Sequence, residues 1–176
     1  MRKSLAVVAV IALFAIPMLA QDHPKADIFG GYQYTRINPG GGASGENFNG
    51  WNAAVTGWVN NYLGVTGDFS GAYKSIGGTA IRQYTFMFGP TIASHANEKF
   101  TPFAHVLLGG AHCTTDAGAC FATSNTAFAL AFGGGLDVNV GHNVGVRVGQ
   151  FDYLMTKFAS DTQNDFRFSA GIVFHF

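Results

Sequence analysis

The sequence predicts an all-β protein, an eight-stranded antiparallel up-and-down transmembrane β-barrel. Apolar and polar residues alternate in segments along most of the chain, and this period of two is the pattern of strands whose faces meet different surroundings. Only 11% of the residues are charged and 48% are hydrophobic, whereas ordinary soluble domains carry about 25% charged residues. Beyond the N-terminal region no apolar run is long enough for a spanning helix, so strands are left to cross the membrane.

Residues 1–20 are predicted to be a secretory signal peptide. Arg2 and Lys3 precede an apolar run over residues 5–16, and a charged start followed by a short apolar run is typical of such signals. The alternative is an uncleaved membrane anchor, but this run is shorter than the roughly 20 apolar residues that a spanning helix needs. Residues 21–176 are therefore expected to form one outer-membrane β-barrel domain.

The first four strands are recognised by residues of like polarity at every second position. We expect them at 27–37, 51–59, 63–73 and 81–92. Asn60 and Asn61 suit a tight turn between the second and third strands, because Asn tolerates positive φ. In the fourth strand, Tyr84, Phe86 and Phe88 form an aromatic stripe.

The next four strands are expected at 103–111, 127–140, 144–153 and 166–176. The fifth cannot be oriented, because Val106 and Leu108 compete with Phe103 and Leu107 for the apolar face. The sixth is clearer, since large apolar residues on one face oppose Ala, Gly, Asp and Asn on the other.

The last strand shows the clearest alternation. One face is wholly apolar, with Phe166, Phe168, Ala170, Ile172, Phe174 and Phe176. A soluble protein seldom leaves such a face on a sheet edge, because the edge invites aggregation. We therefore expect this strand to close the barrel against the strand that starts near Asp27, with its apolar face in lipid.

The predicted connections alternate in length. Short polar turns are expected at 60–61, 93–98 and 141–143, and longer ones at 38–50, 74–80, 112–125 and 155–164. Outer-membrane barrels alternate short periplasmic turns with longer external loops, so this order favours an outer-membrane barrel with an even number of strands. The alternative is a soluble barrel of lipocalin type, which would have a charged exterior. Here the polar face is small and mostly uncharged.

Several short motifs resemble those of a known family. These are Phe29-Gly-Gly-Tyr-Gln-Tyr34, Gly133-Gly-Gly-Leu-Asp137 and the terminal aromatic residue. With the signal peptide, they resemble the small outer-membrane β-barrel proteins of OmpA-like transmembrane type, over essentially the whole mature chain. The peptidoglycan-binding domain of full-length OmpA proteins has no counterpart here, so a tether to the cell wall is not expected.

The resemblance also implies a Gram-negative outer membrane, a route of insertion and a role for the chain. Family members are inserted by the barrel assembly machinery through their last strand, which implies an assembly signal in Phe168, Ile172, Phe174 and Phe176. Frequent roles of the family lie in envelope integrity and adhesion.

Four charged residues are expected to meet in the lumen as a charge network: Asp68, Asp137, Arg147 and Arg167. Asp137 and Arg147 flank the 141–143 turn symmetrically, which makes them near cross-strand neighbours in a hairpin. Asp27 is a further candidate. The network could be a gate or ion path, but the structural interpretation is favoured, because eight-stranded barrels are just wide enough for side chains to fill and charges inside must pair.

Cys113 and Cys120 are predicted to form a disulfide that restricts an external loop. They are the only two cysteines, and an oxidising compartment favours their pairing. A metal site that includes His112 is the alternative, but two thiols and one imidazole are too few for a closed site. Trp51, Trp58 and the tyrosines fit aromatic girdles at the membrane interfaces.

We therefore expect a non-enzymatic outer-membrane protein with a structural or surface-interaction role in adhesion or envelope integrity. A narrow porin-like channel is the alternative. A lipid-modifying enzyme that uses His105 or His175 is a further one, but no local Ser-His-acid motif is present. Expected partners are outer-membrane lipid, the barrel assembly machinery and a surface ligand on the external loops. We expect no catalytic residues, cofactor or metal, and zero net charge gives no reason to expect nucleic acid.

Overall fold

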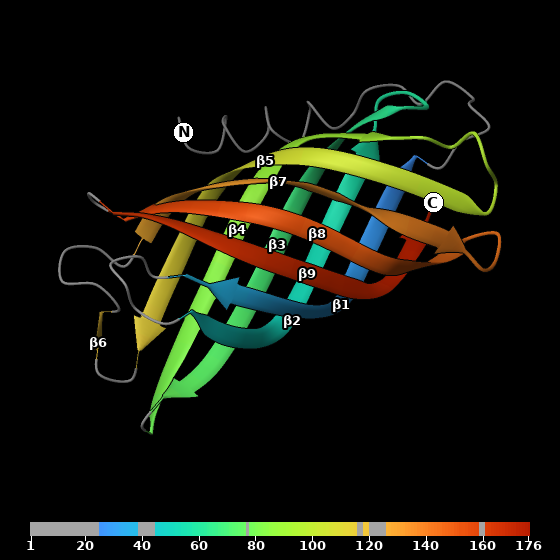
Figure 1. Cartoon of the computed structure of the whole chain (residues 1–176). Coiled ribbons are helices and arrows are strands. Elements are labelled where there is room, and N and C mark those ends of the chain that lie inside the picture. Colours follow the sequence, from blue (N-terminus) through green and yellow to red (C-terminus); the bar gives the residue numbers. More distant parts are fainter. Residues whose placement is uncertain (1–24, 39–44, 77, 116–117, 120–125, 159–160) are drawn as a thin grey trace, which may run out of the picture.

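The computed structural model describes residues 25–38, 45–76, 78–115, 118–119, 126–158 and 161–176 (Figure 1). The predicted signal peptide, residues 1–20, lies outside the described residues. In chain order the strands are β1 (Ala26–Ile37), β2 (Glu46–Trp58), β3 (Leu63–Ile76), β4 (Thr79–Ala93), β5 (Phe100–Thr115), β6 (Gly118–Ala119), β7 (Thr126–Asn139), β8 (Val144–Phe158) and β9 (Asp161–His175). Among the described residues, no helix is long and apolar enough to cross a membrane.

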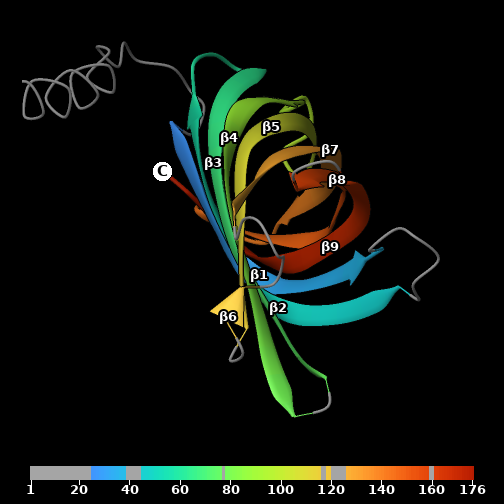
Figure 2. The ribbon, with the colours of Figure 1, turned by 90° about the vertical axis from the view of Figure 1, so that its left-hand side faces the viewer.

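Eight long strands close into a barrel. Their hydrogen-bonded order is β4-β3-β2-β1-β9-β8-β7-β5, and the pairing of β4 with β5 joins the two ends of this sheet. Each neighbouring pair is antiparallel, and Figure 2 shows the strands curving around a common axis. The short β6 pairs antiparallel with the end of β5, at Thr114 and Thr115. The predicted eight-stranded barrel is confirmed.

The two ends of the barrel differ in their connections. At one end, which we call the short-turn end, tight turns join β2 to β3, β4 to β5 and β7 to β8 over residues 59–62, 94–99 and 140–143. The start of β1 and the end of β9 also lie there, where Phe176 N donates to Ala26 O at 2.9 Å. At the opposite end, which we call the loop end, β1 connects to β2, β3 to β4, β5 to β7 and β8 to β9.

Side chains alternate between the lumen and the outer surface as the sequence predicts. On β9, Phe166 and Phe174 are exposed while Arg167 is 2% exposed. The orientation of β5, which the sequence left open, is now clear, because Val106 and Leu108 are exposed while Leu107 is fully buried. The outer surface of the barrel is therefore apolar, and the polar side chains are turned inward.

At the loop end the strands continue well past the alternating segments. β2 begins at Glu46, and the two long hairpin connections predicted at 74–80 and 155–164 shorten to 77–78 and 159–160. Gly78 adopts a φ of 85° in the first of these turns, a conformation that glycine favours. The ladder of backbone hydrogen bonds needs no apolar face, so polarity alternation does not reveal these extensions.

Candidate functional site

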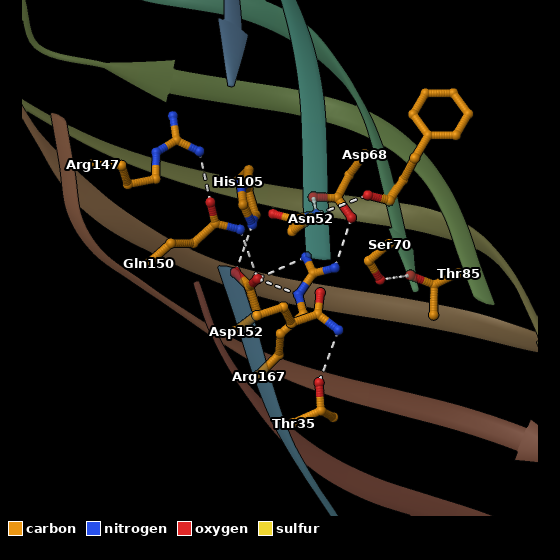
Figure 3. A network of polar contacts seen from close by, with 12 residues as sticks. Thr35, Asn52, Asp68, Ser70, Thr85, His105, Arg147, Gln150, Asp152 and Arg167 are labelled. Carbon is orange, nitrogen blue, oxygen red and sulfur yellow. Dashed lines mark hydrogen bonds and ion pairs between the residues drawn. The ribbon is translucent and has the colours of Figure 1, made fainter. Parts of the chain in front are cut away.

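A network of charged and polar side chains fills the lumen, and Arg167 of β9 lies at its centre (Figure 3). Arg167 Nη1 donates to Asp68 Oδ1 of β3 at 2.7 Å, and Arg167 Nε donates to Asp152 Oδ2 of β8 at 2.8 Å. The three side chains are at most 2% exposed. One guanidinium thus joins two carboxylates across the lumen, and the full desolvation of all three makes their pairing obligatory.

Asp152 connects this centre to two further side chains. His105 Nε2 of β5 lies 2.8 Å from Asp152 Oδ1, and Gln150 Nε2 of β8 donates to Asp152 Oδ2 at 2.8 Å. On the other side, Asn52 Nδ2 of β2 donates to Asp68 Oδ2 at 2.9 Å. The carboxylates therefore use both of their oxygens, as buried charges require.

Arg147 of β8 extends the network toward the short-turn end. Its Nε and Nη2 donate to the two oxygens of Asp137 at 2.8 and 2.9 Å, and its Nη1 donates to Gln150 Oε1 at 2.7 Å. Its guanidinium carbon lies 4.3 Å from the ring centre of Phe29 and 4.1 Å from that of Phe103. Bidentate pairing and stacking both suit the planar guanidinium, so this side chain is fixed in the lumen.

An irregularity in β8 makes this arrangement possible. Arg147 pairs with Gly171 of β9, and Gln150 pairs with Ser169, so β8 carries one residue more than β9 over this stretch. This is a β-bulge, which shifts the alternation of the strand. As a result Arg147 and Gln150 both face the lumen, although residues three positions apart in a regular strand point to opposite faces. Asp152, two residues after Gln150, faces the lumen as well.

A second cluster lies at the short-turn end. Asp27 Oδ1 lies 2.7 Å from His175 Nδ1, and Asp27 Oδ2 accepts a hydrogen bond from Trp58 Nε1 at 2.7 Å. Trp51 lies on the outer surface, 43% exposed, as expected of an interfacial aromatic residue. Trp58 differs from that expectation, because its indole turns to Asp27 and contacts the ring of His95 edge-on at 5.0 Å.

Little space remains between these side chains. A cavity of about 20 Å³ is lined by residues that include Asp68, His105, Asp137 and Arg147, which is room for on the order of one water molecule. Toward the short-turn end, pairs of hydroxyl groups line the inner wall of the lumen. One such pair is Thr66 and Thr91, whose oxygens lie 2.6 Å apart. The geometry suits a packed interior, as expected for a barrel of eight strands.

The structure brings together the four residues of the expected lumen network. Asp68 and Arg167 form one ion pair and Asp137 and Arg147 another, and Gln150 and Asp152 link the two pairs. The sequence did not indicate Asp152, because strict alternation from Arg147 would turn it toward lipid. An aspartate at a lipid-facing position, with Gly149 nearby, is the signal that could have revealed the bulge.

The remaining predicted site residues lie elsewhere. Cys113 is a buried residue of β5, and Cys120 lies outside the described residues, so their disulfide stays a prediction. Ile172 and Phe174 are exposed on the outer face of β9, where Phe168 is half-buried, and Phe176, the residue after β9, is exposed as well. In the part of the chain that the structure describes, no three or more His, Cys, Asp and Glu residues are grouped so as to hold a metal ion.

Comparison with known proteins agrees with this geometry. A model of the outer membrane protein β-barrel domain family matches residues 6–176. The attachment invasion locus protein Ail of Yersinia pestis has a TM-score of 0.64 at 22% identity, covering 88% of this chain and 99% of its own. Neisserial surface protein A has a TM-score of 0.72 at 12% identity over 89% and 100% of the two chains.

A third similar structure is the outer membrane protein OprG of Pseudomonas aeruginosa. It has a TM-score of 0.55 at 13% identity, and the match covers 88% of this chain and 97% of OprG. No curated protein matches the chain closely enough to count as a relative. At these identities the likeness to solved structures concerns the fold.

Proposed function

This chain belongs to the outer membrane protein β-barrel domain family, and we propose on that premise that it is a non-enzymatic, non-conducting barrel with a structural or surface-interaction role. It is a protein of the bacterial outer membrane, as its family and the similar barrels indicate. In such barrels the short turns face the periplasm. The short-turn end then faces the periplasm, and the loop end faces the outside of the cell.

The filled lumen is the observation that supports this proposal over a channel. Arg167, Asp68 and Asp152 bridge the barrel from β9 to β3 and β8, and the cavity beside them measures about 20 Å³. An ion crossing this point would have to break pairs between fully desolvated charges, which costs several kcal/mol each. The same packing supports a structural role for the network.

We expect the purified full-length protein to show no steady unitary currents in planar lipid bilayers. The physical reason is that salt-bridged side chains fill the lumen around a cavity of only about 20 Å³. The folded state of each preparation is checked by its gel migration with and without boiling, since a closed barrel migrates differently before it is heated. Steady currents from folded protein would contradict the filled lumen and favour the channel.

The surface-interaction role is assigned to the connections at the loop end. Ail, which shares the fold, was crystallised with the heparin analogue sucrose octasulfate, so sulfated sugars are a rational first class of ligand to test. We propose that a disulfide between Cys113 and Cys120 restricts the connection between β5 and β7. A short cross-linked loop has fewer conformations to lose when it binds.

We expect the protein to bind heparin-coated beads in a salt-dependent way, and Cys113→Ser to weaken this binding several-fold by freeing the loop. The disulfide itself is checked by mass spectrometry of thiol-alkylated protein before and after reduction. Thr79→Ser, a mild change at the first residue of β4 next to a different connection, is the control. Equal binding by wild-type and Cys113→Ser protein would contradict a role of the disulfide in binding. Absence of binding by both proteins would contradict sulfated sugars as the ligand class.

We further propose that residues 1–20 direct export and that the outer face of β9 is read by the barrel assembly machinery. Phe168, Ile172 and Phe174 line this face and Phe176 follows it directly. β9 pairs with β1 over Asp27–Arg36 to close the wall. A strand that completes the closure is a suitable element to recognise, because the barrel cannot seal before it is in place.

Phe176→Ala is expected to lower the amount of folded protein in the outer membrane several-fold. The Phe176 side chain is 63% exposed, while its backbone N keeps its hydrogen bond to Ala26 O, so the stability of purified protein should change little. Phe128→Ala, which truncates another exposed phenylalanine, is the matched control. Equal membrane levels of the two variants, measured by immunoblotting, would contradict the assembly role.

A further inference from the structure

The outer surface of the barrel carries a hollow near the loop end. Its volume is about 400 Å³, and its exposed lining is almost entirely apolar. It spans β2 to β5 and reaches the start of β7. We call it the aromatic hollow, and its walls and floor include Trp51, Phe69, Tyr84, Phe86 and Gly110.

Gly110 creates the floor of the aromatic hollow. It pairs with Phe86 on β4 and with Phe128 on β7, so large rings stand on either side of a residue without a side chain. A Cβ atom placed on Gly110 would meet only Ala127 O, at 3.5 Å, which is ordinary contact. The backbone therefore accepts a larger residue here, and what the glycine provides is open space on the lipid-facing surface.

The walls of the aromatic hollow are held in place by contacts between rings. Phe69 and Phe86 pack at 5.1 Å between centroids, and Tyr73 and Tyr84 meet edge-to-face at 6.0 Å. Trp51 Nε1 donates to Tyr73 Oη at 3.0 Å. These side chains are ordered by one another, so the hollow is preformed and does not need a ligand to shape it.

Polar and cationic groups lie at the loop-end side of the hollow. His112 pairs with Tyr84 in register, and its Nδ1 lies 3.1 Å from Thr126 Oγ1. Arg82 is an exposed residue that pairs with Tyr73. It lies two residues beyond Tyr84 on the same face of β4, about 7 Å further toward the loop end by the rise of a strand.

We propose that the aromatic hollow binds one acyl chain of a phosphorylated glycolipid of the external leaflet, lipid A, and that Arg82 holds a phosphate of the same molecule. The change from apolar rings to a cation along β4 follows the order of groups in such a lipid, from acyl chain to phosphate. Guanidinium matches phosphate in charge and in geometry. Because the aromatic hollow lies near the loop end, it faces the external leaflet of the outer membrane. The characteristic lipid of that leaflet is this glycolipid rather than a phospholipid.

The test titrates purified lipid A into full-length protein in detergent micelles and counts bound lipid by native mass spectrometry. We expect one tightly bound molecule. Arg82→Gln should weaken its binding about fivefold, the effect expected of one cation near a charged lipid surface. Gly110→Leu should weaken binding to a similar or greater extent, because the new side chain occupies the place of the acyl chain.

Two matched variants serve as controls. Arg36→Gln removes another exposed arginine, from β1 outside the hollow. Gly67→Leu fills a different outward glycine of β3, where a Cβ would meet only Phe69 at 3.8 Å. Both should bind lipid A as the wild-type protein does, and gel migration without boiling verifies that each variant is folded.

Three results would overturn the proposal. Equal effects of Arg82→Gln and Arg36→Gln would mean that lipid A senses only the overall charge. An undiminished affinity of Gly110→Leu would mean that no chain enters the hollow. Equally tight binding of phosphatidylglycerol would mean that the site takes phospholipid rather than the glycolipid. The proposal does not depend on the surface-interaction role, since lipid A can bind whether or not the loops have a ligand.

Discussion

Replacing Arg167 by methionine is expected to destabilise the folded barrel by about 3–5 kcal/mol. The substitution removes the only guanidinium that contacts both Asp68 and Asp152 among the described residues. Methionine fills much of the same space but leaves two buried carboxylates without their counter-ion. The measurement is urea unfolding of purified protein in micelles, with the fraction folded read from gel migration without boiling.

A triple variant separates the charge effect from the volume effect. Asp68→Asn and Asp152→Asn added to Arg167→Met remove both uncompensated charges, so most of the lost stability should return. Arg36→Met is the matched control, because Arg36 is exposed and surface substitutions usually change stability by about 0.5 kcal/mol or less. The account of the network is wrong if Arg167→Met unfolds at the urea concentration of the wild type, or if the triple variant is the less stable one.

Deleting Ala170 from β9 is expected to prevent the barrel from forming. β9 runs without a bulge against β1 from Arg36 to Asp27. When one residue is lost from such a regular strand, all side chains on one side of the deletion move to the opposite face of the sheet. Either Arg167 and Ser169 would turn toward lipid or the outward face from Ile172 to Phe176 would turn inward. A cation at mid-membrane depth costs about 2–4 kcal/mol in barrels of this kind, added to the loss of the lumen network.

Deleting Gly149 from β8 is the matched control, and it should be tolerated. Between Arg147 and Gln150, β8 has one residue more than either neighbour, so removing it restores simple alternation and keeps both side chains in the lumen. The readout for both deletions is refolding into micelles followed by gel migration without boiling. Failure of the Gly149 deletion to fold, alongside that of Ala170, would contradict the description of this position as a bulge.

The sequence was sufficient for the barrel because the lipid and the lumen impose opposite polarity on neighbouring residues. Phe166 and Arg167, or Phe132 and Ala131, show which face is which without any knowledge of the partner strand. β5 could not be oriented because Phe103 and Leu107 are large apolar residues that face inward. Phe103 does so because it packs on Arg147, and such a contact across the lumen depends on strand stagger that the sequence does not display.

The lumen network was only partly accessible from the sequence for a related reason. Asp137 and Arg147 could be paired because a short turn fixes their register within one hairpin. Asp152 and His105 could not, because the bulge in β8 reverses the facing of Asp152 and the two residues come from β8 and β5, which are not neighbours in the wall. The alternation of apolar and polar residues predicts whether a side chain faces the lumen or the lipid. It does not predict which side chain of another strand it contacts across the lumen.

The extension of the strands at the loop end has a consequence for the speed of recognition. Strand pairing continues to Ile76 and Thr79 in one hairpin and to Phe158 and Asp161 in another, so these paired strand ends have few conformations left. Ordering a flexible residue costs about 1–2 kcal/mol, and a partner that docks on these paired strand ends meets backbone that the strand ladder already holds. Binding at the loop end then resembles the docking of two rigid bodies. The association rate is set by diffusion and orientation rather than by a slow folding step.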